Sequence, residues 1–244
     1  MEATPTPDDA QALRQLTLAD EHLLICFCGV DETRDCNSHI LREAMQKIIR
    51  IKIQMGDNHQ ISLARAHESR LVVEQEFTTD ADGLVAVVPG FIALCAQEDL
   101  LDLDVLLDDV THYFGAHQEM EGQSFSSFRL LLIYRQVEQS PRLQTSQRQV
   151  VVPFINNPSY HLDVIYWHHN VPLEMAQNVF NQFFRFDNTN PYAKFYFLEV
   201  GESLERLHQA LVLMLSHPAH RASQDAAEQL LRSCCLPGKS SKIK

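Results

Sequence analysis

The sequence predicts an α/β fold: a doubly wound, mainly parallel sheet with helices on both faces and one antiparallel hairpin at its edge. Three observations predict it. Apolar runs typical of strands buried on both faces occur at 22–28, 128–134 and 160–167. Segments with the spacing of amphipathic helices alternate with these strands along the chain. Two further runs, 61–67 and 70–77, are joined only by Glu68 and Ser69, which is typical of a hairpin.

The first half of the chain begins with strand 22–28, which ends at Gly29. Ser38 is expected to cap a helix that reaches Ile51 or Ile53 and stops before the turn at Gly56. The hairpin follows, and then helices over 84–95 and 100–114. The second of these helices is expected to turn four aspartates towards water: Asp102, Asp104, Asp108 and Asp109.

The second half returns to the same alternation. Strand 128–134 is followed by a polar loop at 140–148 and by strand 160–167. Pro172 opens a helix that continues to Phe184. The remaining expected elements are a strand at 193–200, a helix capped by Ser203 and closed by His217-Pro218, an amphipathic stretch at 225–231, and a basic tail at 239–244.

These boundaries give three parts: a flexible N-terminal arm over 1–19, one domain over 20–217, and a C-terminal segment over 218–244. A hydrophobic content of 45% in 244 residues is enough for a substantial core. The net charge of −12 argues against nucleic-acid and membrane partners, which require a positive face. Without a signal peptide or an apolar run long enough to span a bilayer, an intracellular protein is expected, with reduced core thiols at Cys26 and Cys28.

Candidate chemistry is sparse. The loop after the first strand has neither a glycine-rich phosphate cradle nor a Walker lysine. His168 and His169 end a strand, but adjacent strand residues point to opposite faces, so one metal ion cannot readily take both. Cys234 and Cys235 are adjacent, which is not the spacing of a zinc or redox pair. No catalytic constellation is evident, and we expect a protein that is not an enzyme.

The order of elements resembles that of von Willebrand factor A domains, which have a Rossmann-like sheet. Metal-binding members of that family carry an Asp-x-Ser-x-Ser motif directly after the first strand, with a distant Thr and Asp. Here the Asp position falls on Cys28 and the first Ser on Val30. Because hard cations need such oxygen ligands, we expect a degenerate site with no metal and no cofactor. The alternative, a metal-dependent von Willebrand A ligand-binding module, stays open.

Four stretches in register resemble a degenerate scaffold branch of this family. They are Leu24–Phe27, Arg129–Arg135, Leu162–His168 and Leu211–Arg221. That branch serves two deubiquitinase assemblies, BRISC and its nuclear DNA-damage counterpart, the breast-cancer-protein-A complex. The resemblance implies a non-catalytic scaffold in the cytoplasm and the nucleus, with roles in ubiquitin conjugation, DNA repair and the cell cycle. Its direct partner would be the double ubiquitin-conjugating-variant subunit. A JAMM zinc isopeptidase and its inactive pseudo-protease partner would join through the complex.

The resemblance also implies a docking element after the last long helix, at Pro218 and Arg221, flanked by His217 and His220. Pro218 would preset an extended backbone, and Arg221 would fork onto a carboxylate or onto carbonyls of the partner. On this interpretation, replacing both Pro218 and Arg221 with alanine leaves the fold intact and loosens the complex. The alternative is an ordinary helix stop with a solvent-facing arginine.

Overall fold

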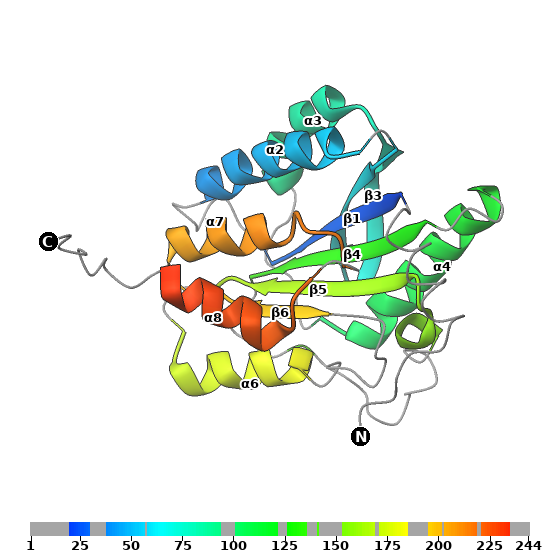
Figure 1. Cartoon of the computed structure of the whole chain (residues 1–244). Helices are drawn as coiled ribbons and strands as arrows, with labels where there is room; N and C mark the ends of the chain where they lie inside the picture. The colour runs from blue at the N-terminus through cyan, green and yellow to red at the C-terminus, as the bar shows by residue number, and fades with distance from the viewer. Residues whose placement is uncertain are drawn as a thin grey trace, which may run out of the picture.

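The computed structural model describes residues 20–29, 38–56, 58–93, 101–121, 126–135, 141, 153–168, 171–184, 195–201, 203–218 and 221–234 (Figure 1). Several features named above lie outside these residues: the arm 1–19, most of loop 140–148, Val30, His169, His220 and the basic tail 239–244.

A six-stranded sheet in the order β3-β2-β1-β4-β5-β6 organises the fold. Its strands are β1 Glu21–Cys28, β2 Gln60–His67, β3 Arg70–Thr78, β4 Ser127–Tyr134, β5 Tyr160–Tyr166 and β6 Tyr196–Glu199. All neighbours pair in parallel except β2 and β3, the predicted hairpin. Its two turn residues, Glu68 and Ser69, both have positive φ, as a type I′ hairpin turn requires. The predicted fold class is confirmed.

Helices cover both faces of this sheet (Figure 1). They are α2 Ser38–Gln54, α3 Ala81–Ala93, α4 Leu103–Glu121, α6 Leu173–Phe184, α7 Leu204–Leu213 and α8 Gln224–Cys234. One apolar core joins the sheet to α2, α3, α7 and α8, and a second joins its opposite face to α4 and α6. Within the described ranges, no helix is both long and apolar enough to cross a membrane.

The central strands β1, β4 and β5 are buried along their whole length, as their continuous apolar runs predict. Cys26 and Cys28 lie side by side in the α4–α6 core as reduced thiols. The same strands also bury three charged residues, Glu21, Arg129 and Asp163, with almost no exposure. Burying a charge is costly unless it is paired, so their partners determine what this part of the fold does.

The start of α4 differs from the prediction. Asp104 is buried, and Asp102 caps the helix by accepting the backbone N–H of Asp104 at 3.0 Å. Asp109 accepts the N–H of Leu71 and pairs with Arg70, so this aspartate holds α4 to the hairpin. The expectation that all four aspartates simply face water was wrong. The helix also continues to Glu121, beyond the predicted end at residue 114, and an unpredicted helical turn spans 153–156.

Candidate functional site

Three features of the described surface and interior are candidates for function: the carboxyl ends of the strands, a buried ion cluster at the opposite end of the sheet, and a groove beside β6. In doubly wound sheets, ligands generally bind at the carboxyl ends of the strands. Cys28 is buried there, and its carbonyl accepts the N–H of Arg135 at 2.9 Å. The Arg135 guanidinium lies 3.7 Å from the centre of the Trp167 ring, so a cation–π contact occupies this edge.

His168 and Glu199 form the second contact at the carboxyl ends of the strands. Nε2 of His168 lies 2.6 Å from Oε1 of Glu199, and this hydrogen bond is the main reason that the pKa of Glu199 is lowered. In the part of the chain that the structure describes, no three His, Cys, Asp or Glu side chains are placed to hold a metal ion. The polar groups at this edge therefore bind one another.

The ion cluster lies at the amino ends of the strands, on the face covered by α2, α7 and α8. It consists of Glu21, Lys52, Arg129, Asp163 and Arg221, whose side chains are at most 1% exposed. Lys52 lies 2.5 Å from one oxygen of Glu21, and Arg129 contacts the other. Arg221 donates to both oxygens of Asp163 at 2.6 Å, in the bidentate geometry that suits a guanidinium. Arg129 also reaches Asp163 at 3.3 Å, which joins the two halves.

Three cations face two carboxylates in this cluster, and each cation also donates to a backbone carbonyl after α7. Arg129 donates to the carbonyl of Met214 at 2.8 Å, and Lys52 to that of Leu215 at 3.1 Å. Arg221 donates from Nε to the carbonyl of Ser216 at 3.2 Å. The carbonyls at the end of a helix lack partners within the helix and carry partial negative charge. The cluster therefore also caps the C-terminal end of α7.

Charge pairing keeps Glu21 ionised. Burial by itself would raise the pKa of Glu21, but the positive charges of Arg129 and Lys52 outweigh it and bring this pKa to about 2. His161, next to the cluster on β5, is affected in the opposite sense. Burial and then the charge of Arg221 lower its pKa to about 3, so this imidazole is neutral at physiological pH.

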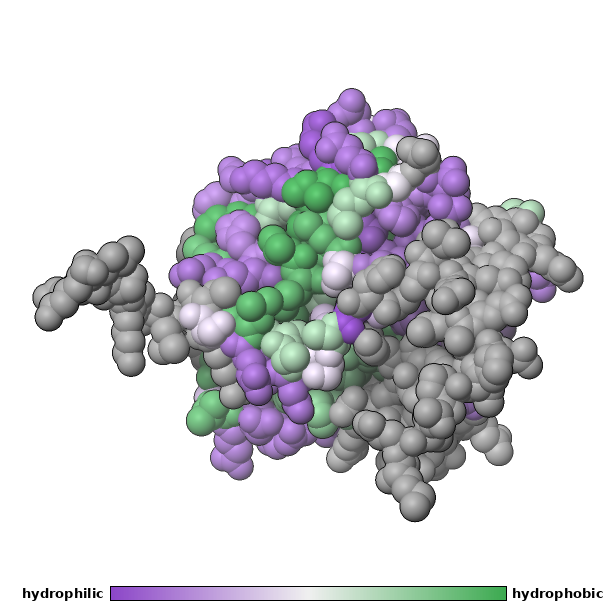
Figure 2. Space-filling view, viewed as in Figure 1, coloured by the Kyte–Doolittle hydropathy of each residue, from purple (hydrophilic) through white to green (hydrophobic). Residues whose placement is uncertain are grey.

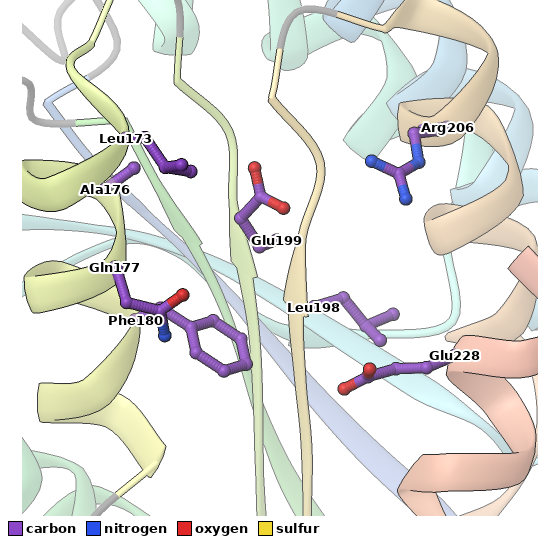
Figure 3. Close-up of a pocket in the computed structure, with 8 residues that line it drawn as sticks. All are labelled: Leu173, Ala176, Gln177, Phe180, Leu198, Glu199, Arg206 and Glu228. Atoms are coloured by element: carbon purple, nitrogen blue, oxygen red, sulfur yellow. The ribbon is translucent and has the colours of Figure 1, made fainter. Parts of the chain in front are cut away.

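A groove runs beside β6, between α6 and α8, and encloses about 180 Å³ (Figure 3). We call it the edge groove. It is lined by Leu173, Ala176, Gln177, Phe180, Leu198, Glu199, Arg206 and Glu228. Figure 3 shows α6 supplying one wall, β6 the floor, and Arg206 and Glu228 the far wall. One wall is therefore mostly apolar, and the opposite side carries charge.

Beside this groove, the side chain of Gln224 covers part of the β6 edge. Its Oε1 accepts the backbone N–H of Phe197 at 2.9 Å, and its Nε2 donates to the carbonyl of Phe197 at 2.9 Å. Nε2 also donates to Glu228 at 2.9 Å. A side-chain amide has the same donor and acceptor as a peptide group, so Gln224 satisfies the outward backbone groups of Phe197, one residue of the β6 edge.

Large apolar side chains are exposed on the helices α2, α6, α7 and α8. On α2, α7 and α8 they are Ile51, Met55 just after α2, Val212 and Leu230, which we call the helix surface. Figure 2 shows apolar side chains gathered in a band from α2 across α7 to α8. On α6, Leu173 is 84% exposed. Gathered apolar residues of this kind are typical of protein-binding surfaces.

Neither a family model nor a curated protein matches this sequence. Solved structures do match in shape. The SpRpn10 VWA domain aligns over 84% of this chain and 100% of its own length, with a TM-score of 0.51 and 12% identity. The fold is of the von Willebrand factor A type. Proximal thread matrix protein 1 from the mussel byssus aligns over 81% of this chain with a TM-score of 0.52 and 8% identity. The chain spans about half of that protein, 48% of its length, and both likenesses concern the fold.

Within this VWA-like fold, the ion cluster brings together three of the four stretches named in the sequence. Arg129 comes from Arg129–Arg135, Asp163 from Leu162–His168, and Arg221 from Leu211–Arg221. Glu21 and Lys52 were not identified from the sequence as candidate site residues, although the sequence around each contains a signal. Glu21 and Arg129 stand at the edges of apolar runs where a charge needs a partner, and Lys52 ends a helix rich in isoleucine.

The expected docking element is placed differently from the prediction. Pro218 is buried, His217 is half-buried, and Arg221 is held in the interior by Asp163. The alternative of a solvent-facing Arg221 was therefore wrong, because both of its terminal nitrogens already bind a carboxylate of the fold. Binding of a partner by Arg221 stays a prediction, and it would require Arg221 to leave Asp163. By the same reasoning, alanine at Pro218 and Arg221 is expected to weaken the fold itself.

Magnesium provides a test of the degenerate strand-end site. Because no cluster of oxygen ligands is present in the described residues, millimolar MgCl2 is expected to change the Tm by less than about 1 °C. Differential scanning fluorimetry with MgCl2 and with EDTA checks this, with KCl added to match the ionic strength. A rise of several degrees that EDTA reverses would favour the metal-dependent ligand-binding module instead.

Proposed function

We propose that this chain is a non-catalytic scaffold that stabilises a linkage-specific deubiquitinase complex of the BRISC type. It would bind the double ubiquitin-conjugating-variant subunit directly, and the JAMM zinc isopeptidase and its inactive pseudo-protease partner would join through the complex. The observation that carries the proposal is the convergence of Arg129, Asp163 and Arg221. Three stretches chosen for their resemblance to that scaffold branch form one buried unit, which supports treating them as parts of a single architecture.

The described surface supports a protein-binding role. The helix surface presents apolar side chains of the kind found at the centre of interfaces, and the groove beside β6 adds a concave region. A net charge of −12 disfavours nucleic acid and anionic membranes as partners. Assembly in both the cytoplasm and the nucleus is part of this proposal.

Co-expression with the three partner subunits tests the proposal. The chain is expected to co-elute with them in a fixed ratio on size-exclusion chromatography, and removal of the ubiquitin-conjugating-variant subunit is expected to release it. Elution of the chain alone, with all four proteins present and folded, would overturn the scaffold role.

A variant pair locates the contact. Val212→Glu with Leu230→Glu places two charges on the helix surface and is expected to weaken assembly at least about tenfold, because a charge buried in an interface loses its hydration. Met120→Glu on α4 is the matched control, since Met120 is exposed but lies off the helix surface. Equal assembly of both variants would place the contact elsewhere.

A further inference from the structure

We propose that the edge groove binds an extended peptide as an added strand beside β6, with one apolar side chain in the groove and basic residues flanking it. The proposal rests on the proposed function only in treating the chain as a protein-binding module. It names the chemistry of a bound segment rather than the complex to which that segment belongs.

The backbone of β6 supports strand addition. Val200 donates its N–H inward to Tyr166 of β5 at 3.0 Å. Because backbone groups alternate in direction along a strand, those of Phe197 and Glu199 point away from β5. Gln224 already pairs with both outward groups of Phe197. Its amide shows that a peptide-like group fits at hydrogen-bonding distance from this edge. Two residues further on, Glu199 presents the next outward pair, directly at the edge groove.

The size of the groove favours a peptide side chain over a small-molecule ligand. Pockets for drug-sized ligands usually enclose about 300–1,000 Å³. The edge groove encloses about 180 Å³, which suits one large side chain. Leu173, Ala176 and Phe180 of α6 form its apolar wall (Figure 3). In strand addition, the main chain supplies affinity and pockets for alternate side chains supply specificity. This groove can therefore bind one apolar side chain of an added strand and so select for it.

The charges around the groove favour basic flanking residues. Glu199 and Glu228 contribute two carboxylates, from β6 and from α8, against the single guanidinium of Arg206. His168 binds Glu199 from the strand ends, and Gln224 binds Glu228 from the β6 side. Lysine or arginine on either side of the apolar residue would meet these carboxylates in a chain whose net charge is −12. Acidic residues at the same places would meet like charge.

A peptide array tests the proposal with the full chain. The probes are ten-residue peptides with a central leucine flanked by lysine, serine or glutamate, and the lysine series is repeated with proline at each position in turn. The labelled chain is expected to bind the lysine series at least about tenfold better than the glutamate series. Because Gln224 already bonds Phe197, the added strand would pair with Glu199, and proline is expected to abolish binding at the peptide residue that faces Glu199 and to be tolerated at its immediate neighbours.

Two variants tie the binding to the groove. Leu173→Ser and Glu228→Gln are each expected to weaken binding of the lysine series by about fivefold or more, whereas Met120→Ser and Glu174→Gln leave it unchanged. Equal Tm values for all four would show that folding is not the cause.

Three results would overturn the proposal: no retention of any peptide, equal retention of the lysine and glutamate series, or proline sensitivity with a helical period. None of them bears on the scaffold role, because co-elution with the partner subunits is measured separately. Conversely, loss of co-elution with intact peptide binding would overturn the scaffold role alone.

Discussion

Replacing Arg221 with alanine is expected to lower the free energy of unfolding by about 3–5 kcal/mol. Arg221 makes two 2.6 Å hydrogen bonds to Asp163, and both side chains are fully buried. Removing the guanidinium leaves the carboxylate in the interior with the longer contact from Arg129 and the backbone N–H of Tyr196. It also takes a donor from the carbonyl of Ser216. For a domain of this size, such a loss corresponds to a fall in Tm of about 10 °C.

Urea denaturation followed by the fluorescence of Trp167, the only tryptophan and a buried one, measures this loss. Arg50→Ala is the matched control. Arg50 also donates to an aspartate, Asp82, at 2.8 Å, but both side chains are largely exposed. Exposed pairs contribute about 0–1 kcal/mol, so this variant is expected to stay close to the parent. Similar unfolding free energies for Arg221→Ala and Arg50→Ala would show that the cluster adds little to stability.

The free energy of unfolding is expected to fall as the pH drops from 6.5 towards 4, with His161 as a main cause. In the folded state the pKa of His161 is about 3, against 6.5 for an unperturbed histidine. Between these values the unfolded chain binds a proton that the folded chain does not, so acid favours unfolding. Arg221, Asp163, Glu21 and Arg129 are the charged groups that act on this ring. One such proton corresponds to about 1.4 kcal/mol per pH unit.

Urea denaturation of the parent and of His161→Gln at pH 6, 5 and 4 separates this contribution. The variant lacks the titrating ring, so its stability is expected to decline less steeply by about 1.4 kcal/mol per pH unit. Glu21 contributes in a lower window in both proteins. Its stabilisation is present above pH 4.5 and is lost as the pH falls through about 2. Parallel pH profiles for the two proteins would mean that His161 is protonated in the fold.

The helices and strands could be predicted because the spacing of apolar residues along the sequence indicates which faces of an element are buried. The uninterrupted apolar runs of β1, β4 and β5 correspond to strands with cores on both faces, and the two-residue link at Glu68 and Ser69 matches the observed hairpin. The turn at 153–156 is too short to show any period. The end of α4 was missed because its last turn is polar and carries no apolar stripe.

The candidate sites were harder to predict because their contacts join residues distant in sequence. A charge inside an apolar run, such as Asp163, signals that a partner exists without identifying it. Arg221 follows a proline after a helix, where an exposed side chain is the usual outcome, and only the tertiary structure brings it under the sheet. The same holds for Gln224, whose position in the sequence gives no sign that its amide binds the edge of β6.

The ion cluster also has a consequence for how the protein is made. Lys52 donates a hydrogen bond to the carbonyl of Leu215, which lies 163 residues later in the chain. Asp163 is paired with Arg221, which lies 58 residues later. A nascent chain that has emerged only as far as β5 already contains Glu21 with its partners Lys52 and Arg129, but Asp163 still lacks its two hydrogen bonds from Arg221. The cluster is therefore complete only once the segment after α7 has been made, and until then burial of Asp163 in the sheet is costly because its main partner is absent. A chain that stops before Arg221 is expected to be unfolded for a larger fraction of the time than the full chain, and so to be cleaved faster by proteases.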